Sequence, residues 1–320
     1  MILVTGATGM LGAHFLLELT RRGQKVRAIY RTDSKRQEVA SFFTYHQCEA
    51  LFEGIEWVSI ALDHPQEIEE ALEGVEQVIH CAALISFDAK DEKRLFETNV
   101  TLTRCLVDSL LVKPAKLLYV SSVAALESED PSYYGQTKYL GELEVFRGIQ
   151  EGLEAHIVRP GVILSDFFWK SPSLSLFKLA FRVKHLCFEG ETGFIAADDV
   201  IQCSLKLLEQ KEVIDVTLVS HHLSYCELIN TIREGVGKPL ATKAFSKEKL
   251  LFIMRFTQFI KRLGFKRLVL SRGLIETLYT KSSYDSLYTY EVFNTLPKRD
   301  FNLFIKELAV TYKRQRGKLI

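Results

Sequence analysis

The sequence lacks the features that mark several large classes of protein. Lysine and arginine nearly balance aspartate and glutamate, and the net charge of +1 argues against a general nucleic-acid binder. No uncharged apolar run reaches the length of a membrane span. We expect no signal peptide either, because residues 1–12 already have the pattern of a strand and a turn. Together these absences predict a cytoplasmic protein.

Cysteine is scarce and has no recognisable spacing. None of the six cysteines forms a C-x-x-C pair or has the histidine spacing of a zinc site. We therefore predict no bound metal, and reduced thiols in a reducing compartment. The cysteines are Cys48, Cys81, Cys105, Cys187, Cys203 and Cys226.

The most informative stretch that is present lies at residues 2–12. It opens on an apolar run typical of a buried parallel strand, and Gly6, Gly9 and Gly12 follow at spacings of three. An apolar helical pattern then runs to Gly23, a suitable residue for the end of a helix. A helix that begins on such a turn directs free N–H groups and its positive dipole end at a phosphate. The stretch therefore predicts dinucleotide binding, the alternative being a structural turn without a ligand.

The end of the second expected strand, at residues 25–30, bears on the choice of cofactor. In NAD-type sites an acidic residue near this point bonds the ribose hydroxyls. Here Arg31 follows the strand, with Lys35 and Arg36 close behind. Cations favour a 2′-phosphate, so we predict NADP, with NAD as the alternative. Without a ligand, the same residues would be a solvated basic loop.

Strands and helices alternate along the first half of the chain. Strand, helix, strand, helix and strand are expected in turn at 56–62, 65–72, 75–83, 91–111 and 117–120. This alternation predicts an α/β protein with a doubly wound parallel sheet, the Rossmann fold. Such a sheet binds its ligands at the carboxyl ends of its strands. His80 lies inside an apolar run and is interpreted as a core histidine.

A group of reactive side chains follows the fifth expected strand, which ends at Ser121 and Ser122. A helix predicted to run from Tyr133 towards Gly152 carries Tyr134 and Lys138, four residues apart and hence on one face. A nearby ammonium lowers the pKa of a phenol by favouring the phenolate, which would let Tyr134 exchange a proton near neutral pH. Such a pair is common by chance, but it is informative after a strand that ends in serine.

These motifs resemble the extended branch of the short-chain dehydrogenase/reductase superfamily, over roughly residues 1–165. The resemblance rests on Thr5-Gly6-x-x-Gly9-x-x-Gly12, Ala82-Ala83, Asn99, Ser121-Ser122, Tyr134-x-x-x-Lys138 and Arg159-Pro160-Gly161. Residues 82–87 and 120–125 are most similar to the 3β-hydroxysteroid dehydrogenase and dihydroflavonol reductase members.

The resemblance implies a role for each matching residue. Tyr134 would be the acid/base, and Lys138 would lower its pKa and hold the nicotinamide ribose. Ser122, rather than Ser121, would bond the substrate oxygen, and Asn99 would support a proton relay through Lys138. The residues implied in cofactor binding are Gly6, Thr8, Gly9, Met10, Leu11, Gly12, Arg31, Lys35, Ala61, Leu62, Ala82, Ala83, Tyr134, Lys138, Pro160 and Val162.

Three departures from the family pattern matter. Ala61 stands where relatives carry an aspartate beside adenine, so that contact is lost or moves to Asp63. Tyr134 comes only twelve positions after Ser122, a short connection that would leave the site more open. The Gly-Pro pair that often follows Arg-Pro-Gly in sugar-nucleotide enzymes is absent, and residues 163–169 read ILSDFFW instead.

The second half predicts a smaller, discontinuous lobe for the substrate. We expect residues 1–165 and 197–221 to form the dinucleotide-binding domain, and residues 166–196 and 222–320 to form the substrate lobe. The apolar, aromatic stretch at 167–188 belongs to this lobe.

Three further expectations concern local features of the second half. An aspartate, Asp198 or Asp199, should cap a helix at 200–209. His221-His222 is expected in a surface turn rather than in a metal site. The stretch 247–270 is strongly basic and carries phenylalanines on one helical face, which is typical of an interfacial membrane helix. We favour the alternative, in which it packs on the lobe and walls the substrate pocket.

The leading interpretation is an NADP-preferring reductase or dehydrogenase that acts on a fairly apolar ketone, aldehyde or secondary alcohol. One alternative is a nucleotide-sugar epimerase or dehydratase, although a dehydratase should add an acidic pair beside the serine and residues 123–125 offer none. Another is a cofactor-binding regulator without turnover, against which the intact Ser/Tyr/Lys set argues. A homodimer is left open.

Overall fold

Short apolar runs build a parallel sheet at the centre of the molecule. The computed structural model describes residues 1–127, 132–182, 185–252, 272–286 and 299–315. Seven strands pair in the order β10-β6-β5-β4-β1-β2-β3, each parallel to its neighbours. They are β1 (Ile2–Thr5), β2 (Val26–Tyr30), β3 (Glu56–Ser59), β4 (Gln77–His80), β5 (Lys116–Val120), β6 (Ala155–Pro160) and β10 (Asp215–Leu218). The predicted doubly wound parallel sheet is confirmed.

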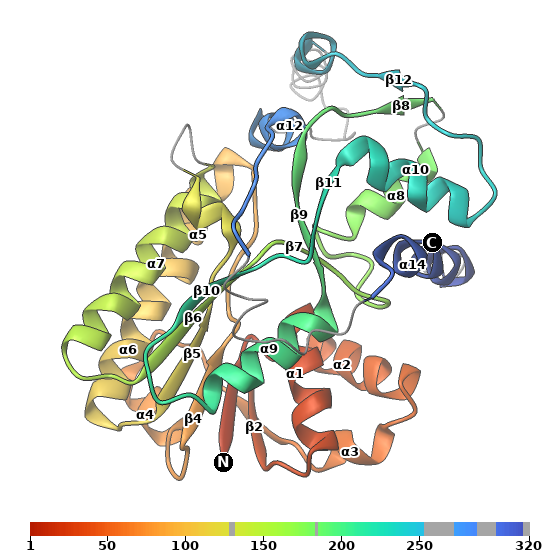
Figure 1. Ribbon diagram of the computed structural model, residues 1–320. Coiled ribbons are helices and arrows are strands. Elements are labelled where there is room, and N and C mark those ends of the chain that lie inside the picture. The colour runs from red at the N-terminus through yellow and green to blue at the C-terminus, as the bar shows by residue number, and fades with distance from the viewer. Residues whose placement is uncertain (128–131, 183–184, 253–271, 287–298, 316–320) are drawn as a thin grey trace, which may run out of the picture.

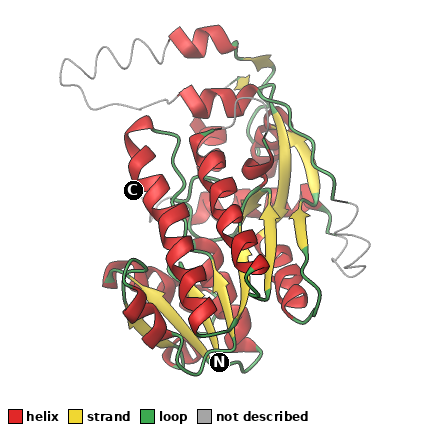
Figure 2. Cartoon of the chain, turned by 90° about the vertical axis from the view of Figure 1, so that its left-hand side faces the viewer, coloured by secondary structure: helices red, strands yellow, loops and turns green. Residues whose placement is uncertain are grey.

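Helices cover both faces of this sheet, as Figures 1 and 2 show. One face carries α1 (Met10–Arg21), α2 (Asp33–Tyr45), α3 (Glu49–Glu53) and α9 (Ala197–Leu208). The other carries α4 (Pro65–Ala71), α5 (Glu92–Phe96), α6 (Leu102–Val112) and α7 (Tyr133–Gln150). Each face has its own apolar core, around Phe15 and Phe42 on the first and around Leu106 and Val145 on the second. Burial of such side chains contributes about 1.5–3 kcal/mol each before the entropy of ordering is subtracted.

Several elements differ from the sequence-based expectations. The helix expected at 91–111 is interrupted by a π-helical turn at Glu97–Thr101 that separates α5 from α6. The helices α2 and α3 were not indicated by the apolar periodicity. The expected aspartate cap of α9 is wrong: Ala196 is the N-cap residue, and Asp198 and Asp199 lie in the first turn, where their charges favour the helix dipole instead.

The second part of the chain packs beyond the carboxyl ends of the large sheet (Figure 1). Its strands are β7 (Val162–Leu164), β9 (Glu191–Ala196) and β11 (His221–Ser224) in one small sheet, and β8 (Leu186–Cys187) with β12 (Lys243–Ala244) in another. Its helices are α8 (Ser175–Arg182), α10 (Tyr225–Gly235), α12 (Arg272–Tyr279) and α14 (Phe301–Gln315). They enclose a core that includes Trp169, Phe177, Ile232 and Tyr312.

The two histidines expected in a surface turn lie in strand β11 instead. The ring of His221 stacks on Phe301 with 4.4 Å between centroids. Nε2 of His222 accepts a hydrogen bond from the backbone N–H of Tyr284 at 2.9 Å. These histidines lie in a strand because β11 pairs with β9, which is distant in sequence. A local sequence pattern does not indicate such a pairing.

The expectation of reduced thiols throughout is wrong for one pair. Cys187 of β8 and Cys226 of α10 form a disulfide across a sequence separation of 39 residues. Their spacing matches no local motif, and only the packing of β8 against α10 brings their Cα atoms within 4.7 Å. The other cysteines, Cys48, Cys81, Cys105 and Cys203, are free thiols.

The basic stretch at 247–270 was interpreted either as an interfacial membrane helix or as a wall of the substrate pocket. Its residues 253–270 lie outside the described part of the chain, so both interpretations stay predictions. Among the residues that the structure describes, no helix is long and apolar enough to cross a membrane.

Candidate active site

The turn between β1 and α1 has the geometry of a phosphate cradle. Gly6 has a positive φ of 62°, and the N–H of Gly9 donates to its carbonyl oxygen at 2.9 Å. A Cβ at Gly12 would lie 2.2 Å from that same oxygen, so the helix start packs directly on the turn. No side chain caps the helix at Gly9, and its first turn holds no acid. The backbone N–H groups of Met10 and Leu11, at the start of α1, are thus left to bind an anion. The turn therefore fits the pyrophosphate of a dinucleotide.

Basic residues follow β2 where the adenosine end of a dinucleotide would lie. Arg31 is exposed directly after the strand. Lys35, in the first turn of α2, pairs with Glu38 at 2.7 Å. The guanidinium of Arg36 lies 5.8 Å from the ring centroids of both Tyr30 and Trp57. Of the cations in this group, Arg31 is the one that projects directly from the strand end.

The remaining residues implied in cofactor binding lie near the same edge of the sheet. Thr8 is half-buried in the glycine turn, and Ala61 and Leu62 follow β3. Ala82 and Ala83 follow β4, and a Cβ at Gly6 would come within 2.5 Å of the Ala82 nitrogen. Pro160 ends β6 and Val162 begins β7. All of them sit at or just beyond the carboxyl ends of their strands, where an open α/β sheet binds ligands.

Ser122 and Tyr134 are brought together by a close approach of two short elements. Ser122 caps the 3₁₀ turn at Val123–Leu126, its Oγ accepting from Ala124 N at 3.2 Å. Ser132 in turn caps α7 by accepting from Gly135 N at 3.1 Å. A Cβ at Gly135 would lie 2.3 Å from the Ala124 carbonyl oxygen, so only glycine lets α7 reach the turn. The Ser122 side chain then lies close enough to Tyr134 to act in the direction that lowers the pKa of its phenol.

Burial controls the electrostatics of Tyr134. It raises the pKa of this phenol to about 12, and the hydrogen bond from Ser122 acts in the lowering direction. The expectation that the Lys138 ammonium lowers this pKa stays a prediction.

Lys138, one helical turn after Tyr134, is buried and points at the end of β5. Its Nζ donates to the carbonyl oxygen of Val120 at 2.8 Å and lies 4.4 Å from the ring centroid of Tyr119. Burial lowers the pKa of Lys138 to about 8, while the nearby Glu142 carboxylate acts in the raising direction. A cation with this pKa is able to change its charge close to neutral pH.

Asn99 lies in the π-helical turn between α5 and α6 and is 1% exposed. Its Oδ1 accepts from Leu84 N at 2.7 Å, and its Nδ2 donates to Leu84 O and to Thr137 Oγ1, both at 3.0 Å. The backbone N–H of Leu84 needs an acceptor and its carbonyl oxygen needs a donor. These two bonds therefore fix which side of the Asn99 amide carries the oxygen and which the nitrogen. Asn99 therefore ties the loop after β4 to α7 beside Lys138. Its part in a proton relay stays a prediction.

His80 behaves as the core histidine that its apolar surroundings predict. Its Nδ1 is 2.6 Å from Thr5 Oγ1, and its Nε2 is 3.2 Å from Thr103 Oγ1. Burial lowers its pKa to about 3, so the ring is neutral in the physiological range.

Sequence reasoning missed a buried ionic group behind the serine pair. Ser121 points away from Ser122 and donates from Oγ to Glu142 at 2.5 Å. Glu142 also binds Arg159 through two hydrogen bonds of 2.8 and 2.7 Å. Its position four residues after Lys138, on the same helix face, was the signal available in the sequence.

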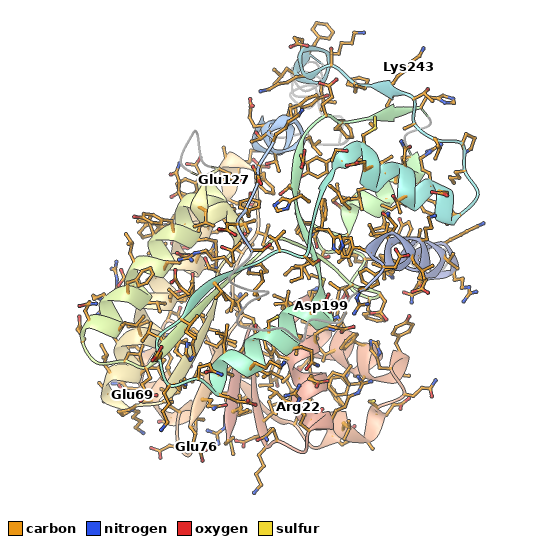
Figure 3. All side chains as sticks on the ribbon, in the orientation of Figure 1. Arg22, Glu69, Glu76, Glu127, Asp199 and Lys243 are labelled. Atoms are coloured by element: carbon orange, nitrogen blue, oxygen red, sulfur yellow. A yellow bond between two sulfur atoms is a disulfide. The ribbon has the colours of Figure 1, made fainter. Side chains whose placement is uncertain are left out.

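The second part of the chain supplies neighbours on the opposite side of the site. The Phe87 ring meets Tyr134 edge-on at 6.2 Å, and a Cβ at Gly273 of α12 would lie 3.6 Å from Phe87. Burial raises the pKa of Tyr284, and the nearby carboxylate of Glu127, labelled in Figure 3, acts in the same direction. Figure 3 also places Asp199 at the start of α9, where it binds Arg299 at 3.3 Å and joins the two parts.

Comparisons with known proteins identify the family of the chain. The model of the NAD dependent epimerase/dehydratase family matches residues 2–217. Sterol demethylase protein B of Methylococcus capsulatus is 28% identical over 257 residues, which make up 74% of this chain and 75% of that protein. A putative dihydroflavonol 4-reductase of Synechocystis is 29% identical over 174 residues, 49% of this chain and 47% of that protein.

A solved structure extends the likeness to the whole chain. The crystal structure of UDP-glucose 4-epimerase with UDP-glucose from Thermotoga maritima matches with a TM-score of 0.75. It covers 98% of this chain and 99% of that one at 16% identity. At this identity the likeness is one of fold.

Proposed function

This chain belongs to the NAD dependent epimerase/dehydratase family, whose model matches more than half of its length, and from this premise we propose that it is an oxidoreductase that prefers NADP and acts on a carbonyl or a secondary alcohol. The observation that carries the proposal is the arrangement of Ser122, Tyr134 and Lys138 at the end of β5. Strand β4 alone separates β5 from β1 and its glycine turn.

Each of these side chains has a distinct part in the proposed reaction. When bound at the glycine turn, a nicotinamide dinucleotide would supply or accept a hydride. During reduction, Ser122 donates a hydrogen bond to the substrate oxygen as negative charge gathers there, and Tyr134 transfers its hydroxyl proton to that oxygen. The Lys138 ammonium, four residues further along α7, would make the resulting phenolate less costly. Asn99 holds α7 against the loop after β4. In this way it also fixes the position of Lys138, which lies on α7.

The proposal also divides the work between the two parts of the chain. Residues 1–165 and 197–221 hold the dinucleotide, and residues 166–196 and 222–320 receive the substrate. Phe87 at the site and the apolar core around Trp169 support a fairly apolar substrate. The names of the two similar proteins, one referring to a sterol and the other to a dihydroflavonol, support the same class.

The alternative is a nucleotide-sugar epimerase, which the likeness in fold to UDP-glucose 4-epimerase favours. In an epimerase the same tyrosine would exchange a proton with the hydroxyl oxygen on a sugar carbon. Residues 123–125 bring no carboxylate to the serine, which argues against a dehydratase.

Substitution of Tyr134 by phenylalanine tests the proposal. Tyr134→Phe removes one hydroxyl, so the fold and NADPH binding should stay nearly intact. Turnover of a ketone or aldehyde, followed by NADPH absorbance, should fall about 10²–10⁴-fold, the usual contribution of a positioned acid or base. Tyr139→Phe, on the same helix but 50% exposed, is the control and should keep parental turnover.

Two results would count against the proposal. Near-parental turnover in folded Tyr134→Phe rejects this residue as the proton donor. If the parent protein binds NADPH but reduces none of a broad panel of ketones and aldehydes, the regulator without turnover becomes the better account.

A further inference from the structure

One buried carboxylate joins three elements behind the proposed catalytic residues. Glu142 is 2% exposed and lies on α7, one turn beyond Lys138. Its Oε1 accepts from Ser121 Oγ at 2.5 Å and from Arg159 Nε at 2.8 Å, while its Oε2 accepts from an Arg159 terminal nitrogen at 2.7 Å. A single side chain on α7 thus holds the residue after β5 and a residue of β6.

Neutralising Arg159 does not by itself require Glu142. A second terminal nitrogen of Arg159 donates to Asp215 of β10 at 2.7 Å, so this guanidinium already has an anionic partner. Burying a second carboxylate costs several kcal/mol unless its further contacts offset that cost. Besides Arg159, Glu142 accepts a hydrogen bond from Ser121 and acts to raise the pKa of Lys138.

The neighbours of Lys138 make Glu142 its source of negative charge. Several titratable groups lie around the Lys138 ammonium. They are His80 of β4, Cys81 just after it, Tyr119 of β5, Tyr134 and Glu142 of α7 and, behind Glu142, Arg159 of β6. Burial lowers the pKa of His80 and raises the pKa of Cys81, Tyr119 and Tyr134, which leaves these four neutral at neutral pH. Glu142, which forms an ion pair with Arg159 at 2.7 Å, is the carboxylate of this group.

We propose that Glu142 is a positioning residue that keeps Lys138 cationic and, by holding Ser121, directs Ser122 towards Tyr134. Successive side chains of an extended backbone point to opposite sides, and Ser122 has extended angles of φ −159° and ψ 151°. Anchoring Ser121 on Glu142 therefore fixes the side on which Ser122 presents its hydroxyl. This inference rests on the proposed roles of Lys138 and Ser122.

The test compares Glu142→Gln, which keeps the shape and removes the charge, with Glu144→Gln on the outer face of the same helix. Protein labelled with ¹³C at the lysine Cε is titrated by NMR, and the Lys138 signal is assigned by its loss in Lys138→Met. The parental midpoint should lie near pH 8. In Glu142→Gln it should fall by about one pH unit or more, because a nearby charge in a partly buried site is worth that much. Glu144→Gln should leave it unchanged, and Glu142→Asp should fall between the parent and Glu142→Gln.

Activity gives an independent readout once a substrate is found. The alkaline limb of the kcat profile of Glu142→Gln should move to lower pH by the same amount, with KM within about twofold of the parent, since no substrate contact is removed. A merely structural role would lower kcat at every pH without moving the limb.

Equal NMR midpoints in the parent and in folded Glu142→Gln would overturn the inference. If Glu142→Gln does not fold, Glu142→Asp decides, because its shorter side chain draws the charge away from Lys138 and a parental midpoint would again overturn it. The titration needs neither cofactor nor substrate, so its outcome is separate from the success or failure of the proposed reductase activity.

Discussion

At the scale of single residues, we predict that the choice of cofactor depends on Arg31. This side chain is exposed directly after β2, whereas Lys35 already pairs with Glu38. A charge-assisted contact to a 2′-phosphate is worth about 1.5–3 kcal/mol, on the order of tenfold to a hundredfold in affinity. We predict that NADPH binds more tightly than NADH, and that Arg31→Ala removes most of the difference.

Calorimetry with both cofactors measures this preference directly. Lys211→Ala, which removes an exposed cation just before the amino end of β10, is the control and should retain the parental preference. Equal affinities for NADH and NADPH in the parent protein would contradict the prediction.

The sequence predicts the residue types of the site better than their contacts. The family resemblance read from Gly6, Ser122, Tyr134 and Lys138 is confirmed by the family match. Spacing identifies such residues because each motif is local. The bond between Asn99 and Thr137 could not be read in this way, because it needs a π-helical turn to aim the amide across to another helix.

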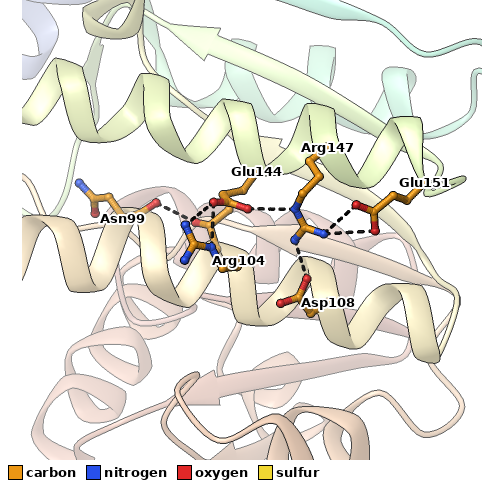
Figure 4. A network of polar contacts seen from close by, with 7 residues as sticks. Asn99, Arg104, Asp108, Glu144, Arg147 and Glu151 are labelled. Carbon is orange, nitrogen blue, oxygen red and sulfur yellow. Dashed lines mark hydrogen bonds and ion pairs between the residues drawn. The ribbon is translucent and has the colours of Figure 1, made fainter.

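At the scale of elements, α7 presents two faces of different kinds. Figure 4 shows its outer face, where Glu144, Arg147 and Glu151 form ion pairs with one another and with Arg104 and Asp108 of α6. These pairs are largely exposed, and surface pairs typically contribute only about 0.2–1 kcal/mol each. The inner face carries Tyr134, Lys138 and Glu142. The close approach of backbone at Gly135, rather than the outer ion pairs, sets the place of this face.

Gly135→Ala should therefore disrupt the site through the position of α7. The new Cβ would lie 2.3 Å from the Ala124 carbonyl oxygen, which cannot give way without shifting the turn that Ser122 caps. We expect a loss of stability of about 1–3 kcal/mol, as for other overpacked positions, together with a large fall in turnover.

Denaturant unfolding and steady-state kinetics check the two effects. Gly54→Ala is the matched control: its φ is −80°, and its new Cβ would make an ordinary contact of 3.6 Å with the Leu51 carbonyl oxygen. Parental turnover and stability in Gly135→Ala would show that α7 can retreat without separating Ser122 from Tyr134.

At the scale of the whole molecule, the first part was more predictable than the second. The large sheet forms from strands that helices connect in order, so local periodicity reveals it. In the second part β9 pairs with β7 and β11, strands from distant parts of the chain, and the disulfide joins residues 39 apart. Such contacts have no local signature, which is why His221, His222, Cys187 and Cys226 were misread.

The two tryptophans of the chain report separately on these two parts. Trp57 on β3 packs against Tyr30 and Phe52 beside the large sheet. Trp169 packs against Phe177 and Tyr312 in the second part. In a Trp57→Phe or a Trp169→Phe background, fluorescence therefore follows the unfolding of one part at a time.

Replacing both Cys187 and Cys226 by alanine should destabilise the second part selectively. A cross-link over a loop of this length contributes about 2–4 kcal/mol, chiefly by restricting the unfolded chain. The restricted segment, residues 187–226, includes β9, α9, β10 and β11, but its ends lie in β8 and α10 of the second part. We expect urea unfolding reported by Trp169 to move to lower urea by about that free energy, with a smaller shift for Trp57. Equal shifts would mean that the two parts unfold as one cooperative unit, and no shift at either reporter would show that the disulfide does not stabilise the fold. Either result would overturn the expectation that the bond acts mainly on the second part.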